Sequence, residues 1–248
     1  MKKTRIAPTP SGFLHAGNRF NAEYICHWAK LEKASIRLRI DDIDRRRFRP
    51  AYLEDIFQCL QEWGIDWHEG PKNSQEFLSL FSQHSKVEKY RQALELLETH
   101  AYVCSCSRKD IEGADWSQGC PSDCTKKKMD LKQGKTALRV RIPGGTETWV
   151  RPDGTQESID LGNHPMHPVV WTREGLPAYH WVSILDDLDH EITDVWRGAD
   201  LLESTGIQRQ LARLAGFTDF DAIRFGHHVL IADAEGKKLS KSVLSGSQ

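Results

Sequence analysis

The sequence of 248 residues lacks a long apolar run and lacks an excess of charge of either sign. No stretch approaches the ~18 apolar residues that a membrane span needs, and residues 1–8 lack the apolar core of a signal peptide. We therefore expect a cytoplasmic protein without a membrane partner. Lys and Arg number 34 against 35 Asp and Glu, so the net charge is −1. This balance excludes a globally basic nucleic-acid coat protein.

Internal repeats and low-complexity tracts are also lacking. Hydrophobic residues make up 39% of the chain and charged residues 28%, which is typical of a folded globular protein. The length fits one domain, or a core with a small insertion. An RNA partner would have to meet a local basic patch, and we single out Lys126–Lys128 with Lys132 as a candidate.

The first hundred residues alternate between strand and helix patterns. Strands are predicted at Lys3–Ile6 and Ile36–Ile40, and helices at Leu14–Leu31, Pro50–Trp63 and Ser85–Thr99. This alternation predicts an α/β fold with a parallel sheet and right-handed crossovers.

Beyond residue 99 the pattern changes to cysteines, glycines and short strand-like segments. Strands are predicted there at Thr136–Ile142, Glu147–Arg151 and Glu157–Leu161. From residue 166 the α/β pattern resumes, with strands predicted at Pro168–Thr172, Ala178–Leu185, Glu191–Trp196 and Ile223–Ile231, and a helix at Ala199–Ala215. We therefore expect a discontinuous core, 1–99 and 166–248, that is interrupted by an inserted subdomain at 100–165.

Four of the six cysteines lie between residues 104 and 124, which favours a metal site over disulfides in a reducing compartment. Four thiolates can hold one structural Zn²⁺ ion in a closed tetrahedral site, and such an ion would stabilise an insertion with little core. The expected ligands are Cys104, Cys106, Cys120 and Cys124. Free thiols are the alternative interpretation. Cys26 and Cys59 fall on predicted helices and are expected in the core.

Two further segments have the composition of a nucleotide site. Residues 8–18 place a Pro/Gly loop directly before a helix, and helix N-termini bind anions. Residues 236–242 form a cationic, hydroxyl-rich loop that could surround a polyphosphate. Taken singly, each has a structural alternative: His15 could cap the helix, and the lysines could be a solvated tail.

Together these segments resemble two signatures of the class I aminoacyl-tRNA synthetases. Residues 15–18 (HAGN) and 238–242 (KLSKS) are similar to the HIGH and KMSKS motifs, in the same order. The flanking residues 5–12 (RIAPTPSG) and 39–44 (RIDDID) resemble the RFAPSPTG and RIEDTD patterns of the glutamyl-tRNA synthetases. Residues 177–187 resemble the family's strand with a substrate-contacting tyrosine before a paired-aspartate turn. Residues 195–201 resemble its VRG(A/E)(D/E)L element, so the resemblance covers nearly the whole chain.

The resemblance implies a Rossmann-type parallel sheet with an inserted zinc-binding α+β subdomain and no anticodon-binding domain. It implies ATP as a substrate, accompanied by Mg²⁺. The implied ATP-binding residues are Pro8, Ser11, Gly12, His15, Gly17, Asn18, Lys238, Ser240 and Lys241. His15, Gly17, Lys238 and Lys241 would be catalytic, because they would stabilise charge as the α-carboxylate of glutamate attacks the α-phosphate.

The resemblance also implies a glutamate site. Its residues would be Arg5, Ala7, Thr9, Asp41, Tyr179 and Arg197. The two arginines would hold the carboxylates, since the planar fork of arginine matches a carboxylate through two hydrogen bonds. Asp41 would face the amino group. Structural alternatives are pairing of Arg5 with Asp42 and of Arg197 with Asp200, or a core position for Tyr179.

The sequence ends six residues after Ser242, so we expect no anticodon-reading region. Short family members of this kind, the glutamyl-Q tRNA(Asp) synthetases, activate L-glutamate with ATP and transfer it to queuosine at the wobble position of tRNA(Asp). The resemblance implies this activity, an anticodon loop as partner and a monomer. Two other functions stay open: an adenylate-forming ligase that passes glutamate or a similar amino acid to a non-tRNA acceptor, and an inactive RNA-binding or regulatory module.

Three positions depart from the family patterns. Asp41 replaces a glutamate and shortens the reach to an amino group by one methylene. Asn18 is the last residue of the HIGH-like motif. Cys120 stands at the position where the short members of the family have a tyrosine.

Overall fold

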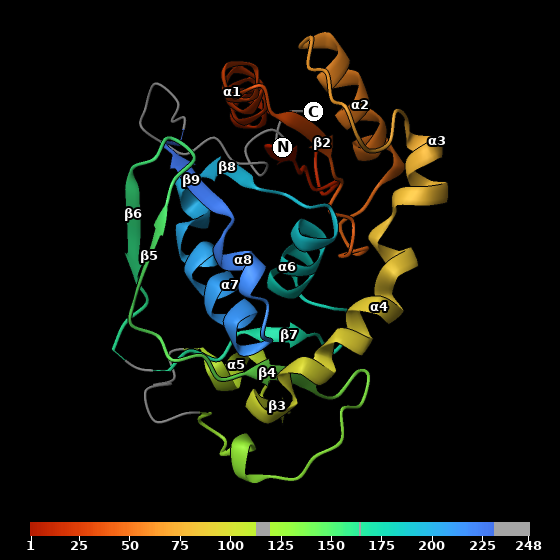
Figure 1. Ribbon diagram of the computed structural model, residues 1–248. Helices are drawn as coiled ribbons and strands as arrows, with labels where there is room; N and C mark the ends of the chain where they lie inside the picture. Colours follow the sequence, from red (N-terminus) through yellow and green to blue (C-terminus); the bar gives the residue numbers. More distant parts are fainter. Residues whose placement is uncertain (113–119, 164, 231–248) are drawn as a thin grey trace. The chain divides into compact units, whose positions relative to one another are not determined.

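The computed structural model describes residues 1–112, 120–163 and 165–230 (Figure 1). The chain divides into two compact units. Unit 1 comprises Met1–Lys86, Glu191–Leu201 and Ile223–Gln248, and unit 2 comprises Val87–His190 and Leu202–Ala222. The expected insertion, residues 100–165, falls within unit 2. Among the helices of the described ranges, none combines the length and the apolar character that a bilayer crossing requires.

The described part of unit 1 is built on four short strands. They are β1 (Lys3–Ile6), β2 (Ser35–Leu38), β8 (Asp194–Gly198) and β9 (Arg224–His228). β1 pairs in parallel with β2, and β8 in parallel with β9. The backbone N–H of Thr193 donates to the carbonyl of Lys3 at 2.9 Å, so β8 follows beside β1. The predicted parallel α/β arrangement is therefore present in unit 1.

The main helices of unit 1 are α1 (Ala16–Glu32) and α2 (Pro50–Glu62). Pro50 occupies the first helical position, where its missing N–H costs nothing and its fixed φ suits the helix. The side chains of Ile25, Leu53 and Ile56 from these helices are almost fully buried in one apolar cluster with the strands. Shorter elements complete the unit: α3 (Ser74–Glu76), the π-turn η1 (Phe77–Phe81), and the 3-10 turns η2 (Gln83–Lys86) and η5 (Ala199–Leu201).

Unit 2 contains a three-stranded antiparallel sheet and a separate hairpin. The sheet has the order β3 (Ala101–Cys104), β4 (Ala137–Val140), β7 (Val169–Trp171), and the hairpin is β5 (Thr146–Val150) with β6 (Gln156–Asp160). The helical elements are α4 (Val87–Gln92), η3 (Ala93–His100), α5 (Arg108–Ile111), η4 (Cys124–Lys126), α6 (Tyr179–Asp189), α7 (Leu202–Leu214) and α8 (Thr218–Asp221).

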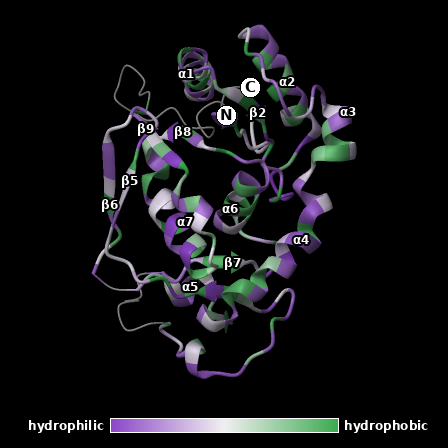
Figure 2. Ribbon diagram, in the orientation of Figure 1, coloured by the Kyte–Doolittle hydropathy of each residue, from purple (hydrophilic) through white to green (hydrophobic). Residues whose placement is uncertain are grey.

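The prediction of a strand at Ala178–Leu185 is wrong, because these residues form most of the helix α6. A continuous apolar run is equally consistent with a buried strand and with a buried helix, and here the helix is enclosed: residues 181–187 are all buried. Figure 2 shows α6 as a largely hydrophobic ribbon. The paired aspartates, Asp186 and Asp187, therefore lie inside a helix and not in the expected turn.

The helix predicted at Ser85–Thr99 is present only in pieces. The chain there passes from η2 through α4 to the 3-10 segment η3. The remaining predicted strands and helices in the described ranges are confirmed, with ends that differ by up to three residues.

Candidate functional site

His15 closes the N-terminus of α1 through a reciprocal pair of hydrogen bonds. Its Nδ1 accepts from the backbone N–H of Gly17 at 3.1 Å, and its own N–H donates to Oδ1 of Asn18 at 3.1 Å. Two of the unpaired N–H groups at the helix start are satisfied in this way. Because Nδ1 accepts, a neutral ring carries its proton on Nε2, which is then the donor. The capping and the nucleotide-binding interpretations of His15 are thus compatible.

Gly17 has a packing role beside this histidine. A Cβ atom at position 17 would lie 3.0 Å from Cε1 and 3.1 Å from Nδ1 of the His15 ring. The absence of a side chain therefore lets the ring lie against the first turn of α1. A larger residue would displace the ring and its Nε2 donor.

The loop before α1 is tied down at both ends. The backbone N–H of Asp41 donates to the carbonyl of Pro8 at 2.9 Å, and that of Leu14 donates to Oδ2 of Asp55 at 2.7 Å. Asp55 lies on α2, so the loop is fixed to both the end of β2 and a helix. The sequence did not point to Asp55. Only the contact of its carboxylate with Leu14, 41 residues earlier in the chain, distinguishes it from other acidic residues on helices.

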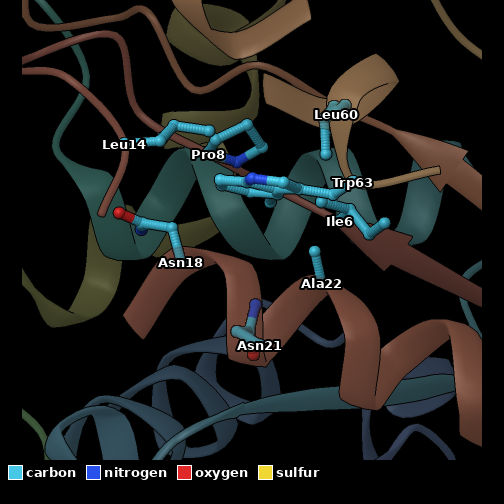
Figure 3. Close-up of a pocket in the computed structure, with 9 residues that line it drawn as sticks. Ile6, Pro8, Leu14, Asn18, Asn21, Ala22, Leu60 and Trp63 are labelled. Atoms are coloured by element: carbon cyan, nitrogen blue, oxygen red, sulfur yellow. The ribbon is translucent and has the colours of Figure 1, made fainter. Parts of the chain in front are cut away.

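A cleft in unit 1 opens beside this loop (Figure 3). Asn18, Asn21 and Ala22 project into it from α1, and Pro8 lies beside the ring of Trp63 on its other side. Of the expected ATP-binding residues, Pro8 and Asn18 therefore share one cleft. The remaining lining residues are Ile6, Ala7, Leu14 and Leu60. Asn21 and Trp63 were not predicted, and nothing in their spacing marks them.

Both arginines expected to bind glutamate are buried strand residues of unit 1. Arg5 lies on β1 with 5% of its surface exposed, and Arg197 lies on β8 with 3%. Nε of Arg197 donates to Nε2 of His227 at 3.4 Å, and its guanidinium lies over the ring of Phe225 at 5.1 Å. Arginine is rarely buried to this extent without partners that use its charge.

Asp41 follows β2 and is held by an arginine of the same segment. Nε and an Nη nitrogen of Arg39 donate to its two carboxylate oxygens at 2.7 and 3.1 Å, and Nε2 of Gln83 donates at 3.1 Å. Its neighbour Asp42 is 1% exposed and accepts from the hydroxyl of Ser82 at 2.6 Å. Asp41 is therefore oriented rigidly by the pair with Arg39.

The other expected glutamate residues differ in placement. Thr9 is exposed in the loop and Ala7 is half-buried there. Tyr179 begins α6 in unit 2 and is 38% exposed, which sets aside the interpretation of this side chain as a core aromatic. Ser11 and Gly12 lie half-buried in the loop before His15. Lys238, Ser240 and Lys241 lie outside the described residues.

The four clustered cysteines of unit 2 converge. Their Sγ atoms all lie within 4.8 Å of one another, and all four residues are buried. The Sγ atom of Cys106 lies 3.4 Å from Sγ of Cys120 and 3.7 Å from Sγ of Cys124. Four tetrahedral Zn–S bonds of standard length place sulfurs about 3.8 Å apart. The residues present therefore fit a zinc ion, and the cluster could hold one.

The surroundings of the cluster shift its thiols in opposite directions: burial raises the pKa of Cys104, and raises that of Cys120 to about 12. Burial acts to raise the pKa of Cys124, but hydrogen bonds from the backbone of Ser105 and from the neighbouring thiols outweigh it and lower that pKa to about 7. Arg173 donates to the carbonyls of Ser105 and Cys106 and so fixes the loop that carries two of the ligands. The hydroxyl of Tyr102, which packs against the cluster, lies 2.9 Å from Nδ1 of His167.

Neighbouring aspartates neutralise part of the basic patch that was expected near the cysteines. Lys126 lies 3.0 Å from Asp123, and Lys132 lies 3.5 Å from Asp130.

These features define a class of protein: an α/β unit with a Pro/Gly loop before a capped helix, and a second unit with four converging cysteines that could hold a metal ion. Comparison with known proteins narrows the class. Residues 2–248 match the family model described as "tRNA synthetases class I (E and Q), catalytic domain". The chain belongs to this family, and with its relatives it is a ligase of the aminoacyl-tRNA synthetase type.

Several relatives carry the name Glutamyl-Q tRNA(Asp) synthetase. The one from Pseudomonas entomophila is 35% identical over 248 residues, covering 97% of this chain and 77% of the relative. The one from Methylococcus capsulatus is 33% identical over 241 residues, covering 96% and 74%. A solved glutamate-tRNA synthetase from Elizabethkingia anophelis has a TM-score of 0.73 at 23% identity, with 97% of this chain and 52% of that chain covered. The chain thus spans about half of that protein. At this identity the structural similarity shows that the two share a fold, and no more.

Proposed function

We propose that this protein activates L-glutamate with ATP and transfers it to queuosine at the wobble position of tRNA(Asp). The proposal is supported by the relatives named Glutamyl-Q tRNA(Asp) synthetase, which match nearly the whole chain. The observation that carries it in the structure is the pair of buried arginines, Arg5 and Arg197, on strands of the unit that also holds the His15-capped helix.

In this proposal the arginines recognise a dicarboxylic amino acid. Arg5 and Arg197 hold the carboxylates of glutamate, with Ala7 and Thr9 beside them in unit 1. Tyr179 of unit 2 is assigned to glutamate binding from the family resemblance alone. Asp41 faces the ammonium group. Its carboxylate already accepts three hydrogen bonds from Arg39 and Gln83, so its negative charge is fixed in place before substrate arrives.

The first chemical step is in-line attack of an α-carboxylate oxygen of glutamate on the α-phosphorus of ATP. The new P–O bond forms glutamyl-adenylate as the bond to pyrophosphate breaks. Mg²⁺ would neutralise charge on the phosphates when bound. His15 donates from Nε2 toward the phosphates, the first-turn backbone at Gly17 lies beside them, and Lys238 and Lys241 stabilise the leaving pyrophosphate. Pro8, Ser11, Gly12, Asn18 and Ser240 complete the nucleotide site.

The second step is attack of a ring hydroxyl of queuosine on the adenylate carbonyl. An ester forms, AMP leaves, and the hydroxyl proton passes to solvent. Because both steps depend on positioning and electrostatic stabilisation, they need no covalent enzyme nucleophile. The cysteine cluster is assigned a structural Zn²⁺ ion that holds residues 104–124 together.

The decisive experiment supplies labelled glutamate, ATP and tRNA(Asp) either with or without queuosine. We expect an alkali-labile glutamyl product only with the queuosine-containing tRNA. Equal labelling of both tRNAs would contradict the proposed acceptor. ATP–pyrophosphate exchange with glutamate but without tRNA tests the first step separately. That exchange should be lost in Lys241→Ala, and its absence from the wild type would indicate a module without activity.

A further inference from the structure

Four arginines stand within the five residues 45–49 of unit 1, in the turn that leads into α2. We call residues 45–49 the arginine turn. Sequence reasoning passed over it in favour of Lys126–Lys128. Three aspartates precede it at positions 41, 42 and 44, so the local charge depends on which arginines these carboxylates neutralise.

Two arginines of the turn are engaged with aspartates. A guanidinium nitrogen of Arg45 lies 2.9 Å from Oδ2 of the buried Asp42, and the group lies over the ring of Phe48 at 4.5 Å. Nε of Arg46 lies 2.9 Å from Oδ1 of Asp44, but the side chains of that pair are 60% and 41% exposed. An exposed ion pair contributes little, so Arg46 can exchange its partner for another anion at small cost.

The other two arginines of the turn form no ion pair with an aspartate or glutamate of the described residues. Arg47 and Arg49 are both exposed. The guanidinium of Arg49 donates to the main-chain carbonyls of Arg46 and Phe48 at 3.4 and 2.7 Å, and these neutral acceptors fix its position without cancelling its charge. Within residues 1–112, 120–163 and 165–230, no carboxylate forms an ion pair with Arg47 or Arg49. The pKa of Asp44 is lowered first by the hydrogen bond from Arg46 and last by the charge of Arg47, so Arg47 is compensated in part. The turn therefore presents two exposed arginines without an ion pair and a third that is weakly held.

An aromatic pair with one exposed ring adjoins the turn. The ring of Phe13 is 56% exposed and meets the ring of Tyr52 edge to face, with centroids 5.0 Å apart. Tyr52 lies in the first turn of α2, and its backbone N–H donates to the carbonyl of Arg49 at 3.0 Å. Phe13 precedes Leu14, whose N–H is bound to Asp55. An apolar ring is thus held at the surface beside the arginines by fixed backbone.

We propose that the arginine turn and Phe13 bind an unpaired stretch of RNA. Bases of any identity stack on exposed aromatic rings, and arginines neutralise the phosphates between them. Phe13 stacks one base while Arg47 and Arg49 hold flanking phosphates. Since Phe13 stands two residues before His15, RNA bound here lies next to the proposed ATP site. This inference rests on the proposed function for its choice of partner, an RNA loop.

The test uses binding alone and needs no queuosine. The probe is a fluorescein-labelled, unmodified RNA hairpin with the sequence of the tRNA(Asp) anticodon arm, compared with a blunt duplex of the same stem. Fluorescence anisotropy gives the affinity at several KCl concentrations. We expect Arg47→Glu/Arg49→Glu to weaken hairpin binding about tenfold or more and to lower the slope of log affinity against log salt by about 1.4, or about 0.7 per lost phosphate contact.

Phe13→Ala separates stacking from charge. It should weaken hairpin binding about tenfold while leaving duplex binding and the salt slope unchanged. The matched control is Lys126→Glu/Lys127→Glu, which makes the same change of charge on exposed residues of unit 2. This control should leave hairpin affinity at the wild-type value.

Unchanged hairpin binding by the arginine variant, or an equal loss in the lysine control, overturns the proposal. Arg47→Gln/Arg49→Gln removes the charge without reversing it, and its ATP–pyrophosphate exchange should equal that of the wild type, which verifies folding. If the wild type binds the hairpin through these residues yet forms no glutamyl-tRNA, the proposed function alone fails. If the wild type glutamylates tRNA and the arginine variants bind and react equally well, only the RNA surface is wrong.

Discussion

Arg197 and His227 lie opposite each other on the parallel strands β8 and β9, and Nε of the arginine donates to Nε2 of the histidine. The ring nitrogen can accept only while it carries no proton. With the ring of Phe225 under the guanidinium, His227 defines the plane of the arginine fork. His227 is therefore a positioning residue for the proposed glutamate site.

His227→Leu should raise KM for glutamate about fivefold and change kcat less, because a long hydrogen bond to a charged group contributes about 1 kcal/mol. ATP–pyrophosphate exchange at varied glutamate concentration measures both constants. His227→Gln offers an amide oxygen in place of the ring nitrogen and should recover part of the loss. An equal fall of kcat in both variants with KM unchanged would argue against a positioning role.

The cysteine cluster should contain about one zinc ion per chain, measured by elemental analysis of the purified protein. Cys106→Ser removes the sulfur that lies 3.4 Å from Cys120 and 3.7 Å from Cys124. We expect it to lose the metal and to lower the melting temperature, as chelation does in the wild type. Cys59→Ser, on α2 of unit 1, is the control and should retain full zinc. Wild-type protein without zinc would favour the free-thiol interpretation.

A buried charge network in unit 2 joins the β5–β6 hairpin to α7. Glu147 on β5 is 6% exposed and accepts from Arg213 at 2.8 Å and from Gln210 at 3.0 Å, with the buried Arg209 3.7 Å away. Glu147→Leu removes one carboxylate partner of the buried Arg209. Asp221, 2.9 Å from Arg209, is then the carboxylate that still pairs with this guanidinium. The free energy of unfolding should fall by about 3 kcal/mol.

Urea denaturation of the double variant Glu147→Leu/Arg209→Met tests this network further. Removing both charges should restore part of the stability, since the desolvation penalty of the arginine disappears with it. Glu157→Gln on β6 is the control, because its partner Arg151 is 3.6 Å away and one quarter exposed. The expected loss there is below about 1 kcal/mol. Additive effects of the two substitutions in the double variant would show that Glu147 and Arg209 are not coupled.

Glu69 should make stability depend on pH in the acidic range. Its carboxylate bridges Lys3 on β1 and Arg37 on β2, each at 2.9 Å. The hydrogen bond from Lys3, followed by that from Arg37, holds the pKa of Glu69 below its usual 4.5. The folded state therefore binds this proton more weakly than the unfolded state. The resulting stabilisation is present above the ordinary pKa and is lost as the pH falls through the lowered one.

Glu69→Gln should accordingly lower the urea midpoint at about pH 7, and this effect should become smaller at about pH 3, because the unfolded carboxyl is by then protonated and the folded one begins to take up its proton. We expect a modest difference, below about 1 kcal/mol, because the side chain is 36% exposed. Glu191→Gln, whose carboxylate lies 3.7 Å from the same lysine and is 85% exposed, is the control and should show almost no difference. A constant difference between wild type and Glu69→Gln at both pH values would contradict the linkage.

Local chemistry was enough to predict much of unit 1. The strand at Lys3–Ile6 agrees residue for residue with β1, and Pro50 marks the start of α2 as its fixed φ and missing N–H require. The cysteine cluster was predicted from spacing, because ligands that are close in sequence need only short loops to converge. These features depend on neighbours along the chain.

Long-range contacts decided the rest. The apolar run around Trp181 is consistent with either a strand or a helix, and only burial on every side made it α6. The partners of Arg197 and of Leu14, namely His227 and Asp55, lie 30 and 41 residues away. The sequence by itself determined which residues could bind an anion or a metal, since that is a property of their side chains. Only the tertiary structure decided which charges stay uncompensated, because neutralisation depends on which groups folding brings within contact distance.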